Sequence, residues 1–153
     1  MVRRRSPPAL TKADYERLAE FRHVLRQFLA FSERAAQAAG LTAQHHQALL
    51  AIKGYPGRNW VTVGELAERL GIKPHSAVEL LNRLEERNLV CRRADADDRR
   101  QVMVEVTDEA EAILADLSVA HREELRRLAP LFSALLSDGA PDPTSANPAR
   151  KRD

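Results

Sequence analysis

The stretch between residues 61 and 107 constrains the fold most, because it combines signals that start and stop two short helices. Thr62 and Glu65 have the spacing of a capping box, in which each side chain bonds to the other residue's backbone amide. Gly71 stands where a left-handed glycine ends a helix, and Pro74 stands where a proline begins the next one. A connection this short sets two helices at a steep angle, so the sequence predicts a helix-turn-helix.

The second helix of this pair should have one buried face and one polar face. Apolar residues at helical spacing mark the buried face: Ala77, Leu80, Leu81 and Leu84. Polar residues occupy the other face: His75, Ser76, Glu79, Asn82 and Arg83. Asn88 fits the left-handed position that follows a helix. The polar face is therefore free to contact a partner.

A two-stranded hairpin is expected after the helix-turn-helix. Residues 89–91 should form its first strand, and residues 101–106 alternate between apolar and polar, as in a half-buried strand. The segment between them, ADADDRR, is too hydrophilic for a core and should form the tip. This arrangement is that of a winged helix-turn-helix, and it most favours binding to double-stranded DNA.

A long helix should precede this unit. Thr11 can cap it, and Gly40 should end it after about Ala39. Its apolar positions spread beyond one stripe: Tyr15, Leu18, Phe21, Leu25, Phe28, Leu29 and Phe31. A helix that is apolar on more than one side has more than one partner, so we expect this one to contact both its own core and a second subunit.

Two smaller elements should lie between the long helix and the helix-turn-helix. Thr42 can cap a helix that runs to about Lys53. A turn-forming cluster of glycine, proline and asparagine follows over residues 54–59. Trp60 and Val61 should then add a short strand beside the hairpin, with the tryptophan in the core.

A second long helix should follow the hairpin, with Thr107 as its cap. Its apolar positions approach a heptad repeat: Leu114, Leu117, His121, Leu125, Leu128, Phe132 and Leu135. Such a seam needs a partner helix, and the winged helix offers little room for one. We therefore expect the two long helices to form a dimerisation platform. Pro130 should kink or split the second of them.

These elements divide the chain into five segments. We expect a disordered N-terminal arm at residues 1–9, an N-terminal dimerisation helix at 10–40 and a winged helix-turn-helix at 41–107. A C-terminal dimerisation helix at 108–138 and a disordered tail at 139–153 complete the chain. The predicted fold class is mainly α with a small β-hairpin wing, flanked by long terminal helices.

Charge and cysteine content narrow the class of protein. The whole chain has a formal net charge of +2, but residues 61 to 107 carry eight arginines and lysines against nine carboxylates, so DNA binding must depend on where the charges lie. One cysteine excludes an internal disulfide and fits a reducing compartment. No apolar run approaches the roughly 20 residues that cross a bilayer, and prolines follow the basic N-terminus where a signal peptide would be apolar. We expect a cytoplasmic protein with no membrane partner.

Several short motifs carry a resemblance to a known family across roughly residues 41 to 117. They are Leu41-Thr42 at a helix start, VGELA at 63–67, LEERNLV at 84–90, DRR at 98–100 and Val106-Thr107 before the last long helix. Together they resemble the MarR family of bacterial transcription regulators, and the DRR after the LEERNLV run is the most specific of them. The resemblance implies a homodimer that binds a palindromic operator and represses transcription until a ligand or an oxidant intervenes.

Two departures from the family pattern matter. Glu79 stands where a basic or small polar residue is common, so it should lower affinity or read the amino group of a cytosine. The oxidant-sensing members carry a cysteine near the start of the first helix, whereas Cys91 lies in the first wing strand and should face the core.

The recognition helix should enter the major groove through its N-terminal half. Ser76 and Asn82 suit base edges, whereas His75 and Arg83 suit a guanine or a phosphate. The alternative for Arg83 is an ion pair with Glu79 on a solvated face.

The wing should add contacts of its own. Its tip should bring Arg99 or Arg100 into the minor groove, and the resemblance implies that Asp98 orients that arginine. The alternative is a solvated charged loop. Arg92 and Arg93 should touch phosphates, unless one of them pairs with Asp95 or Asp97.

A small-molecule effector site, if the chain has one, should lie where the long helices meet the DNA-binding unit. Candidates are Tyr15, His23, His45, His46 and Trp60, although a buried histidine is more often a satisfied core residue. His45 and His46 are adjacent, so they cannot form the i, i+4 zinc pattern. No metal, cofactor or enzymatic activity is expected. The competing functions are a protein-binding winged helix and a small hydrolase using His45 or His46 with Cys91.

Overall fold

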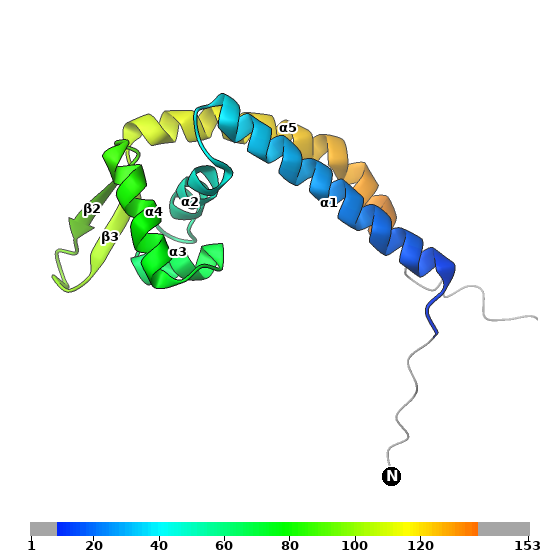
Figure 1. Ribbon diagram of the computed structural model, residues 1–153, viewed down its shortest axis with the longest axis horizontal. Helices are drawn as coiled ribbons and strands as arrows, with labels where there is room; N and C mark the ends of the chain where they lie inside the picture. The colour runs from blue at the N-terminus through cyan, green and yellow to red at the C-terminus, as the bar shows by residue number, and fades with distance from the viewer. Residues whose placement is uncertain (1–8, 138–153) are drawn as a thin grey trace, which may run out of the picture.

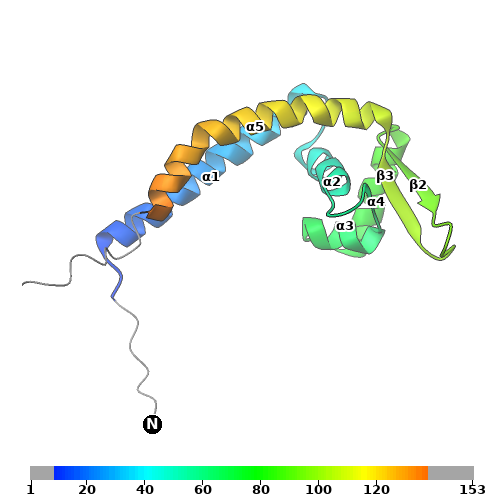
Figure 2. The ribbon, with the colours of Figure 1, turned by 180° about the vertical axis from the view of Figure 1, so that it is seen from behind.

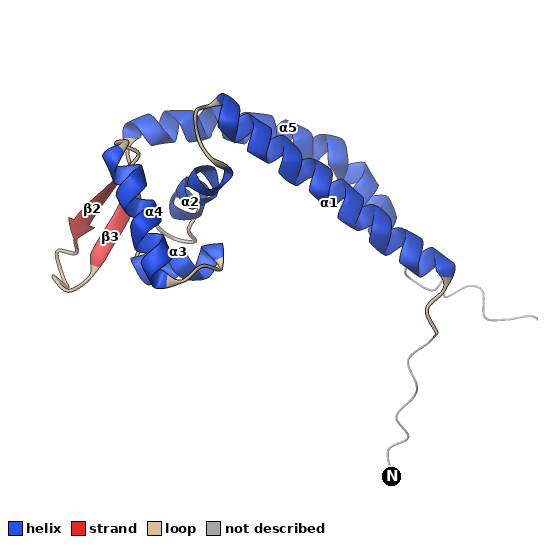
Figure 3. Cartoon of the chain, in the orientation of Figure 1, coloured by secondary structure: helices blue, strands red, loops and turns tan. Residues whose placement is uncertain are grey.

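The computed structural model describes residues 9–137, and its elements follow the predicted order (Figure 3). They are α1 (Lys12–Ala38), α2 (Ala43–Lys53), β1 (Trp60–Val61), α3 (Val63–Leu70), α4 (Pro74–Glu86), β2 (Val90–Ala94), β3 (Val102–Val106) and α5 (Asp108–Ser137). The predicted class, mainly α with a small β wing, is confirmed. Residues 1–8 and 138–153 lie outside the described residues, and with them all but residue 9 of the two segments expected to be disordered, 1–9 and 139–153.

The molecule has two parts, a winged helix and a long arm (Figures 1 and 2). Helices α2, α3 and α4 and the three strands form the winged helix. Helices α1 and α5 lie side by side and antiparallel, and they extend away from it to form the arm. The rings of Phe21 and Phe132, near the far end of the arm, meet edge to face with centroids 5.6 Å apart. None of the described helices combines the length and the hydrophobicity that a membrane-spanning segment needs.

Local capping signals place the helix ends where they were predicted. Thr62 Oγ1 accepts the Glu65 amide, and Glu65 Oε2 accepts the Thr62 amide at 2.8 Å, so the predicted capping box is confirmed. Thr11, Thr42 and Thr107 likewise accept an amide three residues on. Left-handed residues then stop helices: Gly71 ends α3 at φ 63° and Asn88 follows α4 at φ 56°.

The sheet confirms the predicted third strand and corrects two burial predictions. Its order is β1-β3-β2, and all pairs are antiparallel. Val104 on the central strand is fully buried, but Trp60 and Cys91 are only half-buried rather than in the core. The reason is that both pair with Glu105 and so lie on the face of the sheet opposite to the buried pair Val61 and Val104.

Most of the core belongs to the winged helix. Leu49 and Ile52 from α2 meet Leu66 from α3, and leucines from α4 complete the cluster. The buried face of α4 is the predicted one, since its four apolar residues are fully buried: Ala77, Leu80, Leu81 and Leu84. The winged helix therefore closes its own core.

The arm is different, because much of its apolar surface is left open. The sequence did not single out Val24 or Ala36, yet these are the buried residues of α1. Several side chains predicted to pack are at least a third exposed in the single chain: Tyr15, Leu18, Phe21, Leu25, Leu29 and Leu125. The predicted inner contact is therefore present, and an outer apolar face remains without a partner in this chain.

Pro130 does not split α5, which continues to Ser137. Contacts lie on both sides of the proline, because Leu128 is fully buried and Phe132 packs on Phe21. A proline inside a helix removes one backbone hydrogen bond, and packing along α1 keeps the helix continuous despite that loss.

Candidate nucleic-acid interface

Helix α4 presents the polar face that the sequence predicted. His75, Glu79, Asn82 and Arg83 are exposed, and Ser76 is half-buried. No side chain caps the N-terminus of α4, where Lys73 is the N-cap and Pro74 begins the helix. The first backbone amides of α4 therefore remain available to an acceptor such as a phosphate oxygen. Lys73 had not been singled out from the sequence.

The wing tip is held by backbone turns that leave two arginine side chains free. The Asp95 amide donates to the Gln101 carbonyl at 3.0 Å, and the Gln101 amide donates to the Asp98 carbonyl at 2.9 Å. Asp98 Oδ1 accepts the Arg100 backbone amide at 3.0 Å, so its carboxylate shapes the turn and bonds no guanidinium. Within the described residues, the side chains of Arg99 and Arg100 are exposed and have no hydrogen bond or ion pair.

The two arginines of β2 have protein partners that differ from the predicted ones. Arg92 Nη1 donates to Glu85 Oε2 at 2.6 Å, and Arg92 Nη2 donates to Asn82 Oδ1 at 2.8 Å. Arg93 pairs with Glu105 across the hairpin at 3.3 Å. Neither arginine pairs with Asp95 or Asp97. Arg92 thus joins the wing to α4, and its contact with a phosphate stays a prediction.

Arg83 makes no ion pair with Glu79, the alternative considered for it; within the described residues, its side chain has no hydrogen bond or ion pair. The next arginine of this helix end, Arg87, does have partners. It donates to the Gly40 carbonyl at 2.8 Å and lies 3.3 Å from His45 Nδ1. Burial, with the charges of Arg87 and Arg83, holds the pKa of His45 below its usual value.

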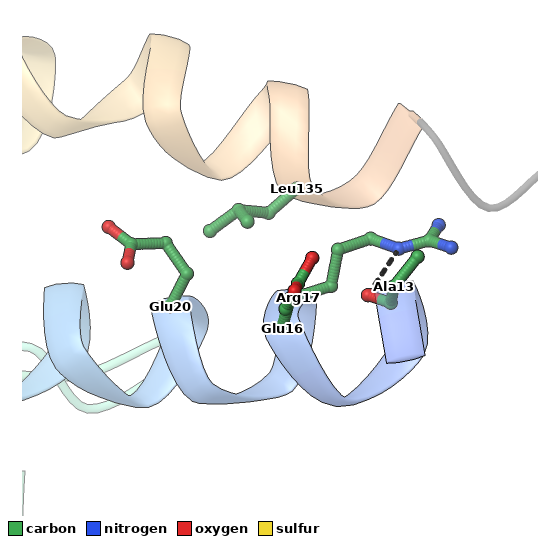
Figure 4. A pocket seen from close by; sticks show the side chains of 5 residues that line it. All are labelled: Ala13, Glu16, Arg17, Glu20 and Leu135. Carbon is green, nitrogen blue, oxygen red and sulfur yellow. Dashed lines mark hydrogen bonds between the residues drawn. The ribbon is translucent and has the colours of Figure 1, made fainter. Parts of the chain in front are cut away.

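The five effector candidates do not converge on one cavity. Tyr15 is exposed on α1, and His23 is exposed and bonds Gln27 on the same helix. His45 bonds Arg87, His46 is buried, and Trp60 lies under another arginine. One pocket, at the far end of the arm, contains none of them (Figure 4). Its lining is Ala13, Glu16, Arg17, Glu20 and Leu135.

His46 does lie at a polar junction between α1, α2 and α5. Its ring centroid is 4.8 Å from that of His121. His121 Nδ1 lies 2.6 Å from the Leu117 carbonyl, which can only accept, so this nitrogen donates. His121 Nε2 lies 2.8 Å from the Ser32 hydroxyl. Burial, together with the neighbouring His121, lowers the pKa of His46.

An arginine–aromatic cluster before α3 was missed by the sequence analysis. The guanidinium carbon of Arg58 lies 3.8 Å from the centroid of the Trp60 ring and 4.5 Å from that of Tyr55. The same arginine forms an ion pair with Glu65. Burial opposes ionisation of Glu65, but hydrogen bonds from Thr62 and Arg58 keep its pKa below the usual value. The cluster fixes the loop onto the start of α3. Its only signal in the sequence is that Tyr55, Arg58 and Trp60 lie within six residues of one another.

The described residues contain no group of three or more histidine, cysteine or acidic side chains that could hold a metal ion. What the surface offers is a polar helix face, an uncapped helix N-terminus and free arginines at α4 and the wing tip. Hydrogen-bond donors and positive charge of this kind can bind base edges and phosphates.

Comparison with known proteins gives matches in sequence and in structure. Residues 39–101 match a family model described as the MarR family. A 49-residue segment is 39% identical to the HTH-type transcriptional repressor MdtR of Bacillus subtilis, and it covers 32% of each protein. The match thus spans about a third of that relative's length.

Solved structures share the fold over most of the chain. AbsC, a MarR family transcriptional regulator from Streptomyces coelicolor, is 22% identical with a TM-score of 0.64, over 84% of this chain and 93% of that one. A mutant of MepR from S. aureus bound to an oligodeoxyribonucleotide is 18% identical with a TM-score of 0.62, over 85% and 96%. At these identities the likeness shows the fold alone.

Proposed function

We propose that this chain is a regulator of the MarR type, because residues 39–101 match the model of that family, and that it is a homodimeric transcription regulator that binds double-stranded DNA. The earlier resemblance to this family is thereby confirmed. The DNA target is a palindromic operator, because two-fold related subunits present two equivalent recognition helices to two half-sites.

One observation carries the proposal: the N-terminal end of α4 and the tip of the wing point the same way. Both lie at the end of the winged helix that faces away from α5 (Figures 1 and 2). Arg99 and Arg100 are exposed there, and the polar face of α4 is exposed beside them. A helix can then enter the major groove while the wing arginines reach the adjacent minor groove.

The open face of the arm supports the homodimer. Leu18 is 59% exposed, Leu125 48% and Leu136 75%. Large apolar side chains gathered on one part of a surface are characteristic of an interface. The near-neutral charge of residues 61 to 107 means that one subunit would bind DNA weakly, and pairing doubles the number of correctly placed arginines.

Repression that a small-molecule effector relieves completes the proposal. The similar MdtR is named a transcriptional repressor. The buried junction around His46 and His121 connects the arm to the winged helix, so a change there would alter the spacing of the two recognition helices. Tyr15, His23 and Trp60 lie elsewhere and are not part of this proposed effector region.

The low charge favours one competing function, a winged helix that binds another protein. A gel-shift titration with the DNA upstream of the protein's own gene separates the two. We expect saturable binding whose affinity falls steeply with salt, because cations on the protein displace counterions from the phosphates. Absence of a shift at low salt with any promoter-proximal DNA would favour the protein-binding function.

The double variant Arg99→Ala, Arg100→Ala tests the wing. We expect operator affinity to fall by more than tenfold while the dimer stays intact, because the minor-groove contacts are lost. The matched control removes two exposed arginines from α5, Arg122→Ala and Arg126→Ala, and should leave affinity unchanged. If the wing variant binds within a factor of two of the unaltered protein, the proposed role of the wing is wrong.

A further inference from the structure

The contact between the wing and α4 has a consequence for which base the protein can read. Arg92 reaches from β2 to two residues that lie one helical turn apart on α4. Its guanidinium donates to Glu85 Oε2 at 2.6 Å and to Asn82 Oδ1 at 2.8 Å. The Arg92 side chain is only 25% exposed, so this contact is partly shielded from solvent.

The chemistry of these groups fixes the orientation of the Asn82 amide. A guanidinium has N–H donors and no acceptor, so the atom of Asn82 that faces Arg92 must be the carbonyl oxygen. The Nδ2 amino group then occupies the other end of the planar amide. Because Asn82 is exposed on the polar face of α4, that amino group is the part of the side chain available to a ligand.

Asparagine commonly reads adenine through both ends of its amide. Its oxygen accepts from the adenine N6 amino group, and its nitrogen donates to N7. Here the adenine amino group would have to share that oxygen with the Arg92 guanidinium, so two donors crowd one acceptor and the second bond of the bidentate pair is weakened. Guanine, with acceptors at N7 and O6, and thymine, with an acceptor at O4, bond the free amino group without needing the shared oxygen.

We propose that Arg92 holds Asn82 as a hydrogen-bond donor, so that the operator position facing Asn82 is selected for guanine or thymine and against adenine. This specificity rests on the proposed function. Arg92 is thus a positioning residue, since Glu85 offsets its charge and two of its N–H groups bond Glu85 and Asn82. The wing thereby takes part in reading the major groove without entering it.

Selection of bound sequences from a random double-stranded DNA library tests the proposal. The unaltered full chain is compared with Arg92→Met, which keeps an unbranched, shorter side chain and has no donors. The variant Asn82→Ala locates the base pair concerned, because the preference at that position should disappear. At that position we expect Arg92→Met to raise the ratio of adenine to guanine by about tenfold or more, with the other positions unchanged.

Three further variants make the result decisive. Arg93→Met, at the exposed neighbouring arginine, should keep the original preference. Asn82→Ala combined with Arg92→Met should show no gain of adenine. If Arg92→Met does not fold, as judged by circular dichroism, Arg92→Lys replaces it. A single ammonium group pairs with the Glu85 carboxylate and leaves the Asn82 amide free to turn, so the same shift is expected.

The outcomes separate this inference from the proposed function. An unchanged base profile in a folded Arg92 variant, or a preference of the unaltered protein for adenine at that position, would overturn the inference alone. Failure of the unaltered protein to enrich any DNA sequence would overturn the proposed function and the inference together.

Discussion

The winged helix and the arm differ in how far their apolar side chains are buried within the single chain. In the winged helix, leucines from α3 and α4 such as Leu66, Leu81 and Leu84 are fully buried within the single chain. In the arm, Leu25 is 39% exposed, Leu125 48% and Leu136 75%. The winged helix therefore has the features of a self-contained fold, whereas the arm is incomplete until another surface covers it.

The largest effect should come from charging the open face of the arm. The double variant Leu25→Asp, Leu125→Asp should weaken dimerisation by at least 100-fold, because each new carboxylate would be buried without a partner. Light scattering should then give the monomer mass of 17.2 kDa, and circular dichroism should show that the helices remain. Val78→Asp, an equally exposed apolar position on α4, is the control and should stay dimeric. A dimer that survives the double change would mean that the open face is not the interface.

A smaller effect is expected when a core residue of the winged helix is truncated. Leu81→Ala should lower the free energy of unfolding by roughly 2–5 kcal/mol, since Leu81 is fully buried and the change leaves a cavity. Leu18→Ala, at a leucine that is 59% exposed in the arm, should cost little by comparison. Urea unfolding of both, in the monomeric Leu25→Asp, Leu125→Asp background, removes any contribution of the subunit interface. Equal costs would show that the two regions are not packed as differently as we describe.

The junction of the two regions should make stability depend on pH. His46 is buried, and burial with the neighbouring His121 lowers its pKa below 6.5. As the pH falls below about 6.5 the unfolded chain binds a proton before the folded chain does, so stability is complete above that pH and decreases below it. Urea unfolding at pH 7.5 and at pH 5.5 should show this loss.

Two variants test whether His46 causes that pH dependence of stability. His46→Phe keeps a ring at the junction but cannot be protonated, so it should reduce the loss of stability at pH 5.5. Part of the loss should remain, because burial and nearby arginines also lower the pKa of His45. His75→Gln, at an exposed residue of α4, should behave as the unaltered protein. If His46→Phe loses as much stability as the unaltered protein does, the junction is not the source.

The two regions also differ in how far their structure follows from sequence. Helix ends were predicted well, because a cap such as Thr62 with Glu65 acts within one turn. The inner face of α1 was not, since its apolar residues surround the helix and only contact with α5 decides that Val24 is the buried one. Pro130 was expected to kink or split α5, and the helix is not split, because packing on both sides of the proline is something that a local rule does not include.

Among the candidate contact residues, sequence identified the surface but not the pairings within it. The exposed face of α4 follows from its helical period, so His75, Glu79, Asn82 and Arg83 were placed on it as expected. Their roles at the DNA stay predictions. The partner of Arg92 could not be found from spacing, because Asn82 and Arg92 lie on different elements and meet only after the wing folds against α4. The same holds for Arg58, which stacks on Trp60 across a turn.

The smallest effects are predicted for the capping boxes, one of which begins a helix in each region. Thr62→Ala removes the box at the start of α3, which is partly buried and is reinforced by the ion pair between Glu65 and Arg58. It should lower the free energy of unfolding by about 1 kcal/mol. Thr11→Ala removes an equivalent box at the start of α1, where the capping residues are exposed and the helix has few contacts. That first turn can fray without unfolding the rest of the chain, so the cost there should be only a few tenths of a kcal/mol.

Urea unfolding of the two single variants provides the measurement, and amide hydrogen exchange separates their causes. In Thr62→Ala the amides of α3 should lose protection together with the core, because α3 packs through Leu66 into it. In Thr11→Ala the loss should be confined to the first turn of α1. If Thr11→Ala lowers the free energy of unfolding as much as Thr62→Ala does, the far end of the arm unfolds together with the winged helix. The two regions would then differ in the burial of their side chains but not in their stability.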